Sequence, residues 1–371
     1  MKKILMIATC NFITNHNDGG RQCSYRNYDF LCQTFGKDNV MLYMITNDLI
    51  ENNQNITCYP TYRNKIQQIV WALKCRNGYS RKTEEKIISD VEATNWDYIW
   101  FDRSTLGSLC KKIRINAKKI VFFHNIEKEY IKNKIQHENI GYILSYHAFV
   151  KNEEIAINEA TRVLCLNQRD SEKLYKNYGR KADFLLPISF QDTYRGNEWH
   201  QVDKIGKKLL FVGSYFQPNI EGIEWFIQNV MPKLCDVQLI IVGKDMEKKA
   251  NEWNSERVKV IGTVSNLSEY YMKADAVVLP IFYGDGMKVK TAEALMYGKI
   301  IFGSREAFEG YEVDGNRDVV RCDTAEEYIY NIIQFYQEKP KDYFSMENRQ
   351  LFLDRYENKT LSKKFKEFIY K

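Results

Sequence analysis

Residues 207–226 read KKLLFVGSYFQPNIEGIEWF, which joins a short apolar run, a glycine turn and a helical pattern in direct succession. The apolar run is typical of a buried strand. Gly213 and Ser214 end that strand, so they either let a ligand approach the backbone or form a tight turn that needs glycine. The helix that follows presents unpaired N–H groups, which favour an anion, and Asn219 is its expected N-cap.

The same alternation of strand and helix extends in both directions and breaks once, at the polar segment 189–208. Expected strands before the break are 2–8, 39–45, 97–101, 118–123, 161–166 and 182–187, with helices near 21–35, 81–94, 105–117 and 142–159. Expected strands after it are 207–213, 237–243, 258–262, 275–282, 299–303 and 317–321, with helices near 219–233, 266–273, 288–297 and 324–338. The pattern predicts two doubly wound α/β halves, each with a parallel sheet.

Composition describes an ordinary globular protein whose basic residues gather in its first half. Of 371 residues, 44% are hydrophobic and 27% are charged, and no apolar run is long enough to span a membrane. Nine scattered cysteines without C-x-x-C indicate reduced thiols in the cytoplasm, not disulfides or a zinc site. Residues 1–190 hold 28 basic and 20 acidic residues, against 26 and 28 in the remainder. This asymmetry indicates either an acidic partner or solubility alone.

Residues 284–299 read GDGMKVKTAEALMYGK and follow an expected strand of the second half. Glycines, the cations Lys288 and Lys290, a helix start and the carboxylate Glu293 lie together there. This set suits a phosphorylated ligand that carries hydroxyl groups, although a turn with solvated charges has the same composition. No P-loop or dinucleotide fingerprint and no D-x-D motif is present.

Two places in the first half have polar groups at expected strand ends. Gly19 and Gly20 lie between the first strand and the first helix, as a passage for a ligand or a flexible connector. His124 and Asn125 follow the strand 118–123, where active-site groups collect in such sheets. A structural role for His124 is the alternative.

Residues 61–82, TYRNKIQQIVWALKCRNGYSRK, hold six basic residues and no acid, beside an apolar face. A basic amphipathic helix of this kind rests on anionic membranes, or it packs its apolar face into a core. Although the basic first half would also suit a nucleic acid, we expect no nucleic-acid partner.

Together, the GG turn, FHNIE, FVGS with its helix, and GDGMKVKTAEALMYGK followed by EAFEGYEV resemble family 4 glycosyltransferases of bacterial surface-polysaccharide assembly. The resemblance implies the GT-B fold, with two Rossmann-like domains facing across a cleft and a C-terminal helix crossing back. It implies an acceptor domain of residues 1–190 joined by 350–371, and a nucleotide-sugar domain of residues 191–349.

The resemblance also implies a hexosyltransferase-type reaction from a nucleotide sugar, UDP by default, to a polysaccharide or lipid-linked glycan, with retention of configuration. His124, Asp285 and Glu293 take the catalytic positions. Glu293 binds the donor ribose, and Asp285, eight residues earlier, contacts the donor sugar in place of a glutamate. Further donor-binding positions are Gly20, Asn125, Gly213, Ser214, Val264, Gly286, Lys288 and Lys290.

This chain departs from the family where an Arg and a Lys commonly hold the diphosphate, because Tyr215, Phe216 and Gln217 stand there. Lys288 or Lys290 is the expected replacement. Without D-x-D we expect a reaction that needs neither metal nor cofactor, in the cytoplasm or at the inner face of the cell membrane. The alternatives are a non-catalytic GT-B partner of another transferase, or a nucleotide-sugar epimerase of the same fold.

Overall fold

A computed structural model describes residues 2–14, 19–48, 54–64, 66, 67, 69, 70, 74, 78–137, 143–196, 206–284, 286–338 and 343–371. The chain divides into two compact units, residues 1–188 with 361–371, and residues 189–360. Helix α13 (Met346–Arg355) lies in the second unit, whereas the sequence analysis assigned residues 350–371 to the first. The reason is local packing: Arg349 Nη1 donates to Met296 O at 2.7 Å, and the Tyr356 ring lies 5.0 Å from that of Tyr311.

The first unit is built on a seven-stranded parallel sheet in the order β3-β2-β1-β4-β5-β6-β7. The strands are β1 (Ile4–Ala8), β2 (Val40–Ile45), β3 (Ile56–Tyr59), β4 (Tyr98–Phe101), β5 (Lys118–Phe123), β6 (Arg162–Cys165) and β7 (Phe184–Leu185). The helices are α1 (Gly19–Phe35), α3 (Arg81–Glu92), α4 (Gly107–Lys112), α5 (Glu127–His137), α6 (Ile143–Glu159) and α7 (Gln168–Tyr178), with 3-10 turns η1 (Lys37–Asn39) and η2 (Ser104–Leu106). Both faces of the sheet are buried, so its strands read as continuous apolar runs.

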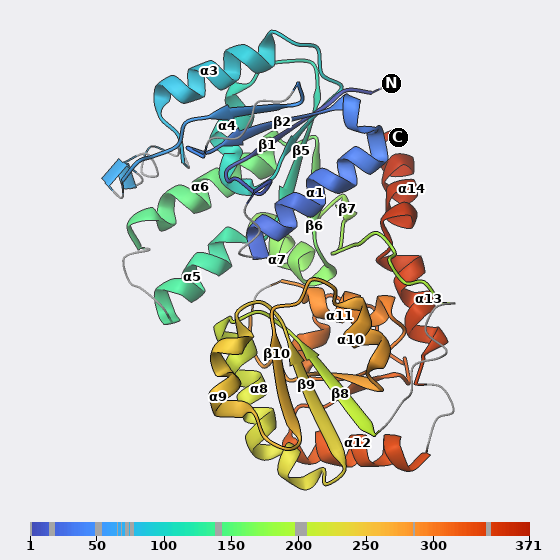
Figure 1. The fold of residues 1–371 in the computed structure, drawn as a ribbon. Coiled ribbons are helices and arrows are strands. Elements are labelled where there is room, and N and C mark those ends of the chain that lie inside the picture. The colour runs from blue at the N-terminus through green and yellow to red at the C-terminus, as the bar shows by residue number, and fades with distance from the viewer. Residues whose placement is uncertain are drawn as a thin grey trace. The chain divides into compact units, whose positions relative to one another are not determined.

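Helix α14 (Asn358–Ile369) lies beside α1 and brings the C-terminus near the N-terminus (Figure 1). The Phe365 side chain is fully buried, with its ring 5.5 Å from Phe30 and 6.2 Å from Trp100. The predicted return of the C-terminal helix to the first unit is therefore confirmed, and aromatic packing by Phe365 and Phe368 anchors it.

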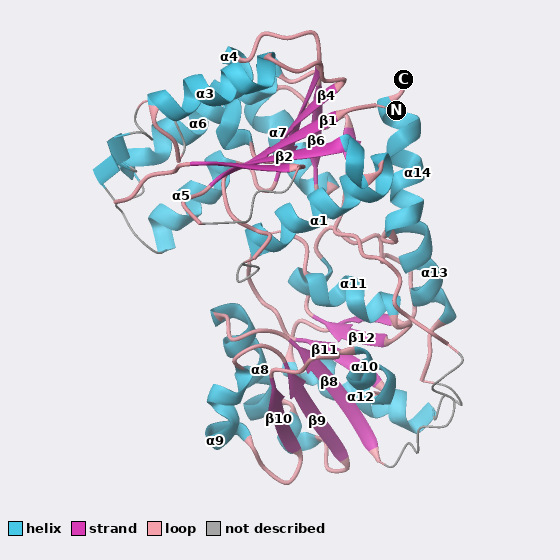
Figure 2. Cartoon of the chain, turned by 45° about the horizontal axis from the view of Figure 1, so that its top comes forward, coloured by secondary structure: helices cyan, strands magenta, loops and turns pink. Residues whose placement is uncertain are grey.

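The second unit holds a six-stranded parallel sheet in the order β10-β9-β8-β11-β12-β13. The strands are β8 (Lys207–Val212), β9 (Val237–Val242), β10 (Val258–Gly262), β11 (Ala276–Leu279), β12 (Ile300–Gly303) and β13 (Val319–Arg321). The remaining elements are α8 (Gln217–Asn229), η4 (Met231–Lys233), η5 (Met246–Lys249), α9 (Ala250–Trp253), α10 (Ser268–Lys273), α11 (Val289–Met296), η6 (Arg305–Phe308) and α12 (Ala325–Glu338). Helices α8 and α9 lie on one side of β8–β10, and α10 and α11 on the other (Figure 2).

Both sheets thus have the doubly wound topology that the sequence predicts. In each sheet, successive strands are first added toward one edge and then, after a single switch, toward the other. The reversals fall between β1 and β4 and between β8 and β11. Loops part to opposite faces at such a point, so the carboxyl ends of these strand pairs are where each unit can admit a ligand.

Candidate functional site

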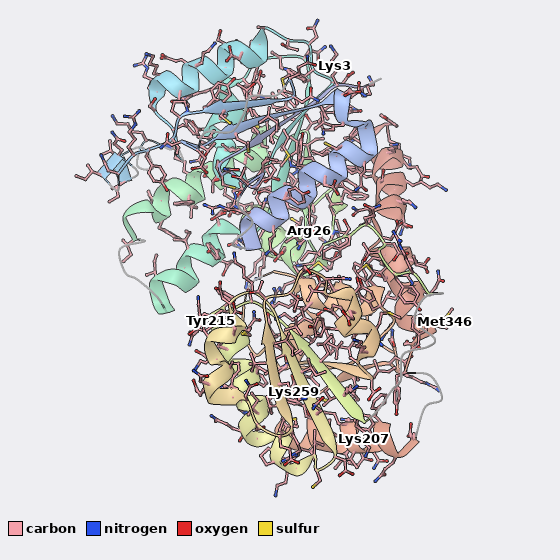
Figure 3. The ribbon with its side chains drawn as sticks, in the orientation of Figure 1. Lys3, Arg26, Lys207, Tyr215, Lys259 and Met346 are labelled. Atoms are coloured by element: carbon pink, nitrogen blue, oxygen red, sulfur yellow. The ribbon has the colours of Figure 1, made fainter. Side chains whose placement is uncertain are left out.

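The carboxyl edge of the second sheet carries most of the predicted donor-binding residues. Lys207 begins β8 and Tyr215 follows its carboxyl end, so their side chains mark the amino and carboxyl ends of this strand (Figure 3). Gly213 N donates to Val242 O at 2.9 Å, which continues the β8–β9 pairing by one residue. A Cβ on Gly243 would lie 1.9 Å from Gly213 O, so the ends of β8 and β9 approach as closely as only glycine allows.

Asn219 is not the N-cap of α8, as the sequence analysis expected, because Phe216 holds that position and Pro218 occupies the first turn. Instead, Asn219 Nδ2 donates to Ser214 O at 2.9 Å. Its Oδ1 accepts a hydrogen bond from Lys290 Nζ. The side chain therefore connects the turn after β8 with the start of α11 across 71 residues of sequence.

Lys290 lies in the first turn of α11 with its ammonium group against the end of β8. Its Nζ lies 4.9 Å from the centroid of the Phe211 ring, besides the hydrogen bond to Asn219. Burial, reinforced by the charge of Lys288, lowers the pKa of Lys290 to about 7, while Glu293 acts in the opposite direction. An anion at this position would supply the countercharge that the neutral Asn219 does not.

Lys288, two residues earlier, has different surroundings. Its Nζ lies 2.7 Å from Glu306 Oε1 and donates to Gly286 O at 2.8 Å. The structure thus separates the two predicted cations: Lys288 is engaged by a carboxylate and backbone carbonyls, and Lys290 by an amide and an aromatic face.

Glu293 is one turn along α11 from Lys290 and is half-buried. Tyr271 OH donates to Glu293 Oε2 at 3.1 Å, and the buried Tyr271 ring stacks on Tyr297 with centroids 4.8 Å apart. Burial, together with the charge of Glu293, raises the pKa of Tyr271 well above its usual value, so the phenol remains a donor. One carboxylate oxygen of Glu293 is thereby fixed in orientation.

The remaining second-unit positions lie on the same edge of the sheet. Gly286 adopts a φ of 68°, and Val264 is half-buried just after β10. Asp285, the predicted contact to the donor sugar, lies outside the described residues. Over the described part of the chain, no three His, Cys, Asp or Glu side chains are placed to hold a metal ion.

In the first unit, His124 follows β5 and is buried beside Asp102, which follows β4. His124 Nε2 lies 3.2 Å from Asp102 Oδ2, while Asn27 Nδ2 donates to Asp102 Oδ1 at 2.7 Å. Burial acts to lower the pKa of His124, but negative charge on Cys23 and Asp102 outweighs it and raises the pKa to about 9. Among the described residues, His124 Nδ1 is buried and has no hydrogen-bond partner, so it can bond to a ligand.

The turn that carries His124 and the half-buried Asn125 is held by a residue of another helix. Glu153, on α6, accepts from the backbone N of Glu127 at 2.5 Å and from Tyr178 OH at 2.6 Å. Burial, and then the charge of Glu153, raises the pKa of Glu127 to about 7. Gly20, in contrast, is the second residue of α1 rather than part of a turn before it.

Asp102 and Asn219 are the two site residues that sequence reasoning missed. For Asp102 a signal was present, since it directly follows the expected strand 97–101, as His124 follows the strand 118–123. For Asn219 there was none, because its role depends on contacts with Lys290 far along the chain.

Comparisons with known proteins agree with this geometry. Residues 206–338 match the family model described as glycosyl transferases group 1. Sucrose-phosphate synthase from Thermosynechococcus elongatus superimposes with a TM-score of 0.71 at 14% identity, covering 100% of this chain and 98% of that one. HepE from Anabaena, in complex with UDP and glucose, gives 0.68 at 13% identity and full coverage of both chains. No curated protein matches the chain by sequence.

The galactosyltransferase WaaB of the lipopolysaccharide outer core gives a TM-score of 0.65 at 13% identity, covering 99% of both chains. Two doubly wound sheets joined in one chain, matched along their whole length by these structures, define the GT-B fold. The chain thus has the GT-B fold, and residues 206–338 of its second unit are similar to group 1 glycosyl transferases.

Proposed function

We propose that this protein is a glycosyltransferase and that it transfers a hexose from a UDP-sugar to a polysaccharide or lipid-linked glycan acceptor. The observation that carries the proposal is the pairing of Lys290 with Asn219 at the β8–β11 switch point, one helical turn from Glu293. A buried cation beside exposed backbone suits a diphosphate, and a fixed carboxylate suits the ribose hydroxyls. HepE, which has the same fold, binds UDP and glucose.

Within this proposal, Lys290 and the backbone amide of Ser214 hold the diphosphate, and Gly213 leaves room for it because it has no side chain. Glu293 binds the ribose. Gly20, Val264 and Gly286 contact the donor through small or uncharged groups. Asp285 contacts the donor sugar. Because Asp is one methylene shorter than the family's usual Glu, its reach toward that sugar is the most specific departure to test.

We further propose that His124, beside Asn125 in the first unit, is a catalytic residue that donates a hydrogen bond to a sugar substrate. Asp102 engages His124 Nε2 at 3.2 Å, which leaves Nδ1 as the ring nitrogen available to the sugar. A hydrogen bond that fixes a sugar hydroxyl also orients the anomeric carbon, and this orientation lowers the barrier to transfer.

The proposed reaction proceeds with retention and without metal. In glycosyl transfer the transition state develops positive charge on the sugar and negative charge on the leaving diphosphate. Lys290, the helix dipole of α11 and the amide of Ser214 would stabilise that leaving group. The sequence supports metal independence through the lack of a D-x-D motif.

A screen of nucleotide sugars by thermal shift, followed by a transfer assay with the best donor, tests the proposal. A nucleotide sugar that binds the folded state raises the melting temperature by mass action. We expect a UDP-sugar to do so, and its label to move to a glycan acceptor. A non-catalytic partner would bind no nucleoside diphosphate, and an epimerase would consume the donor without acceptor.

For the acceptor side, we propose contact between residues 61–82 and the anionic inner face of the cell membrane. Ile66 is 74% exposed, and Ile69 and Val70, three and four residues later, are exposed as well. Arg63 and Lys74 are exposed on either side of these three residues in the chain. Exposed aliphatic side chains between cations suit an interface of acyl chains and acidic head groups. No helix in the described residues is long and apolar enough to cross a bilayer.

Membrane contact predicts co-sedimentation with vesicles of phosphatidylglycerol and phosphatidylcholine at low salt. Ile66→Glu with Val70→Glu should reduce the bound fraction about tenfold or more, since each change removes apolar burial and adds repulsion. Ile143→Glu is the matched control, because Ile143 is an exposed aliphatic residue outside 61–82. Equal binding by the double variant and the control would contradict this part of the proposal.

A further inference from the structure

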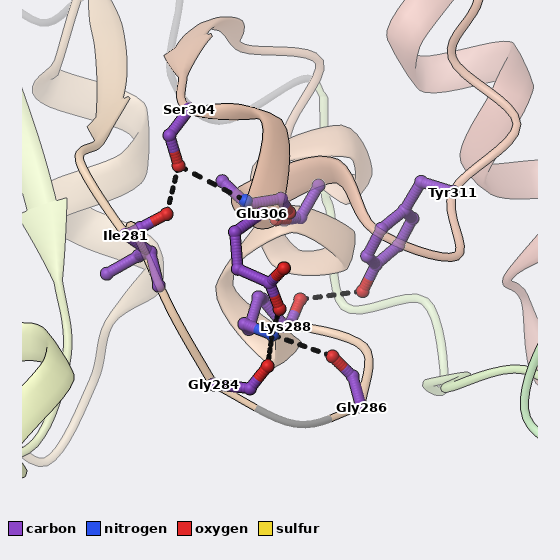
Figure 4. A network of polar contacts seen from close by, with 9 residues as sticks. Ile281, Gly284, Gly286, Lys288, Ser304, Glu306 and Tyr311 are labelled. Atoms are coloured by element: carbon purple, nitrogen blue, oxygen red, sulfur yellow. Dashed lines mark hydrogen bonds and ion pairs between the residues drawn. The ribbon is translucent and has the colours of Figure 1, made fainter. Parts of the chain in front are cut away.

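The ammonium group of Lys288 is the centre of a polar network after β11 and β12 (Figure 4). It donates to Gly286 O at 2.8 Å, lies 3.4 Å from Gly284 O, and pairs with Glu306 Oε1 at 2.7 Å. The Lys288 side chain is only 11% exposed. Two carbonyls of the loop after β11 and a carboxylate of η6 therefore converge on one buried cation.

The partners of Lys288 are fixed in turn by contacts between the same two segments. Ser304 Oγ donates to Ile281 O and begins η6, which carries Glu306. Tyr311 OH donates to Lys288 O at 2.6 Å, so the backbone of Lys288 is held as well as its side chain. Ile281, Gly284, Gly286 and Lys288, in and beside the loop after β11, are thus all linked to the segment after β12.

The loop itself needs such support because of its backbone conformation. Gly284 has a φ of 140° and Gly286 a φ of 68°, regions that residues with a side chain rarely adopt. A Cβ on Gly284 would lie 3.5 Å from Lys288 Cε, so the lysine side chain packs directly over the loop. A chain with two glycines is flexible when unconstrained, and the ammonium group supplies the constraint by attracting both carbonyls.

We infer that Lys288 is a positioning residue: its ammonium group holds the backbone carbonyls of Gly284 and Gly286 beside Glu306 and so fixes these two glycines next to the donor sugar, without itself contacting the diphosphate. The inference rests on the proposed function. The two cations then have different roles, since Lys290 has no ion pair with a carboxylate among the described residues and its ammonium group lies at the end of β8. Lys288 then acts on turnover and Lys290 on binding.

The test compares Lys288→Met, Glu306→Gln, the double variant and Lys290→Met by UDP calorimetry and by turnover with a UDP-sugar. We expect Lys288→Met and Glu306→Gln each to lower kcat about tenfold or more while the UDP dissociation constant stays within about twofold. The double variant should be no slower than Lys288→Met alone, because both changes break the same contact. Lys290→Met, the matched control, should weaken UDP binding instead.

The sign of the Glu306→Gln effect separates the two possible roles of Lys288. If Lys288 bound the diphosphate, removing the competing carboxylate would strengthen UDP binding, and Lys288→Met would weaken it. Either result, or an unchanged kcat in both single variants, would overturn the inference. If Lys288→Met fails to fold, Glu306→Gln still decides, since it keeps the size of the side chain. Failure of the wild type to bind any nucleoside diphosphate would refute the proposed function itself.

Discussion

Replacing Glu293 with alanine is expected to abolish sugar transfer and to weaken UDP binding by about 10- to 100-fold. Hydrogen bonds from neutral donors to a charged carboxylate contribute about 1.5–3 kcal/mol each, and the proposed ribose contact would lose them. The loss should appear in calorimetric titration with UDP and in turnover at saturating donor. Tyr271→Phe, which removes only the hydroxyl that donates to Glu293 Oε2, should have a smaller effect in the same direction.

The structure also supplies the control for Glu293→Ala. The Tyr271 and Tyr297 rings stack on each other irrespective of the Glu293 carboxylate, so the melting temperature of the free variant should remain close to that of the wild type. A folded Glu293→Ala variant that retains wild-type transfer would remove Glu293 from the site.

Lys290→Met is expected to have opposite effects on binding and on stability. It should weaken UDP binding by about 100-fold, because a charge-assisted contact to a diphosphate is lost in a buried setting. It should also raise the melting temperature of the free protein. The wild type keeps an amine in an environment that lowers its pKa from 10.5 to about 7, mainly through burial. Methionine removes that cost while filling a similar volume.

The stability effect of Lys290→Met has a defined pH dependence. Between about pH 7 and 10.5 the unfolded chain holds a proton on Lys290 that the folded protein has lost, so wild-type stability rises with pH in this interval. The destabilisation by Lys290 is complete below about pH 7, and the variant should gain most there. Melting curves at about pH 6 and about pH 9 check this. A destabilised variant with unchanged UDP affinity would contradict the role of Lys290.

The architecture could be predicted from the sequence because parallel strands that are buried on both faces are recognisable as apolar runs. All six strands expected in the second half are present, within a few residues of their predicted bounds. Strand β3 was missed because it is a four-residue edge strand. Helices α5 and α7 were missed since their sequences, EKEYIKNKIQH and QRDSEKLYKNY, contain few apolar residues.

The candidate site was predictable in its location and not in its contacts. Motif position placed His124 at the end of a strand, and Lys290 and Glu293 in the helix that follows another strand, which follows from local sequence. Which lysine faces a carboxylate could not be read from the alternation of Lys288 and Lys290, because Glu306 and Asn219 approach from different parts of the fold. Long-range packing decides such pairings, and a single sequence does not display it.

The central claim is that the second unit holds a nucleotide-sugar site built around Lys290 and Glu293. Calorimetric titration of the wild type and of Lys290→Met with UDP tests it most directly. We predict one UDP site per wild-type chain, and binding weakened by about 100-fold in the variant at about pH 7. Absence of binding by the wild type to UDP and to the other common nucleoside diphosphates, or equal affinity of the two proteins for UDP, would contradict the claim.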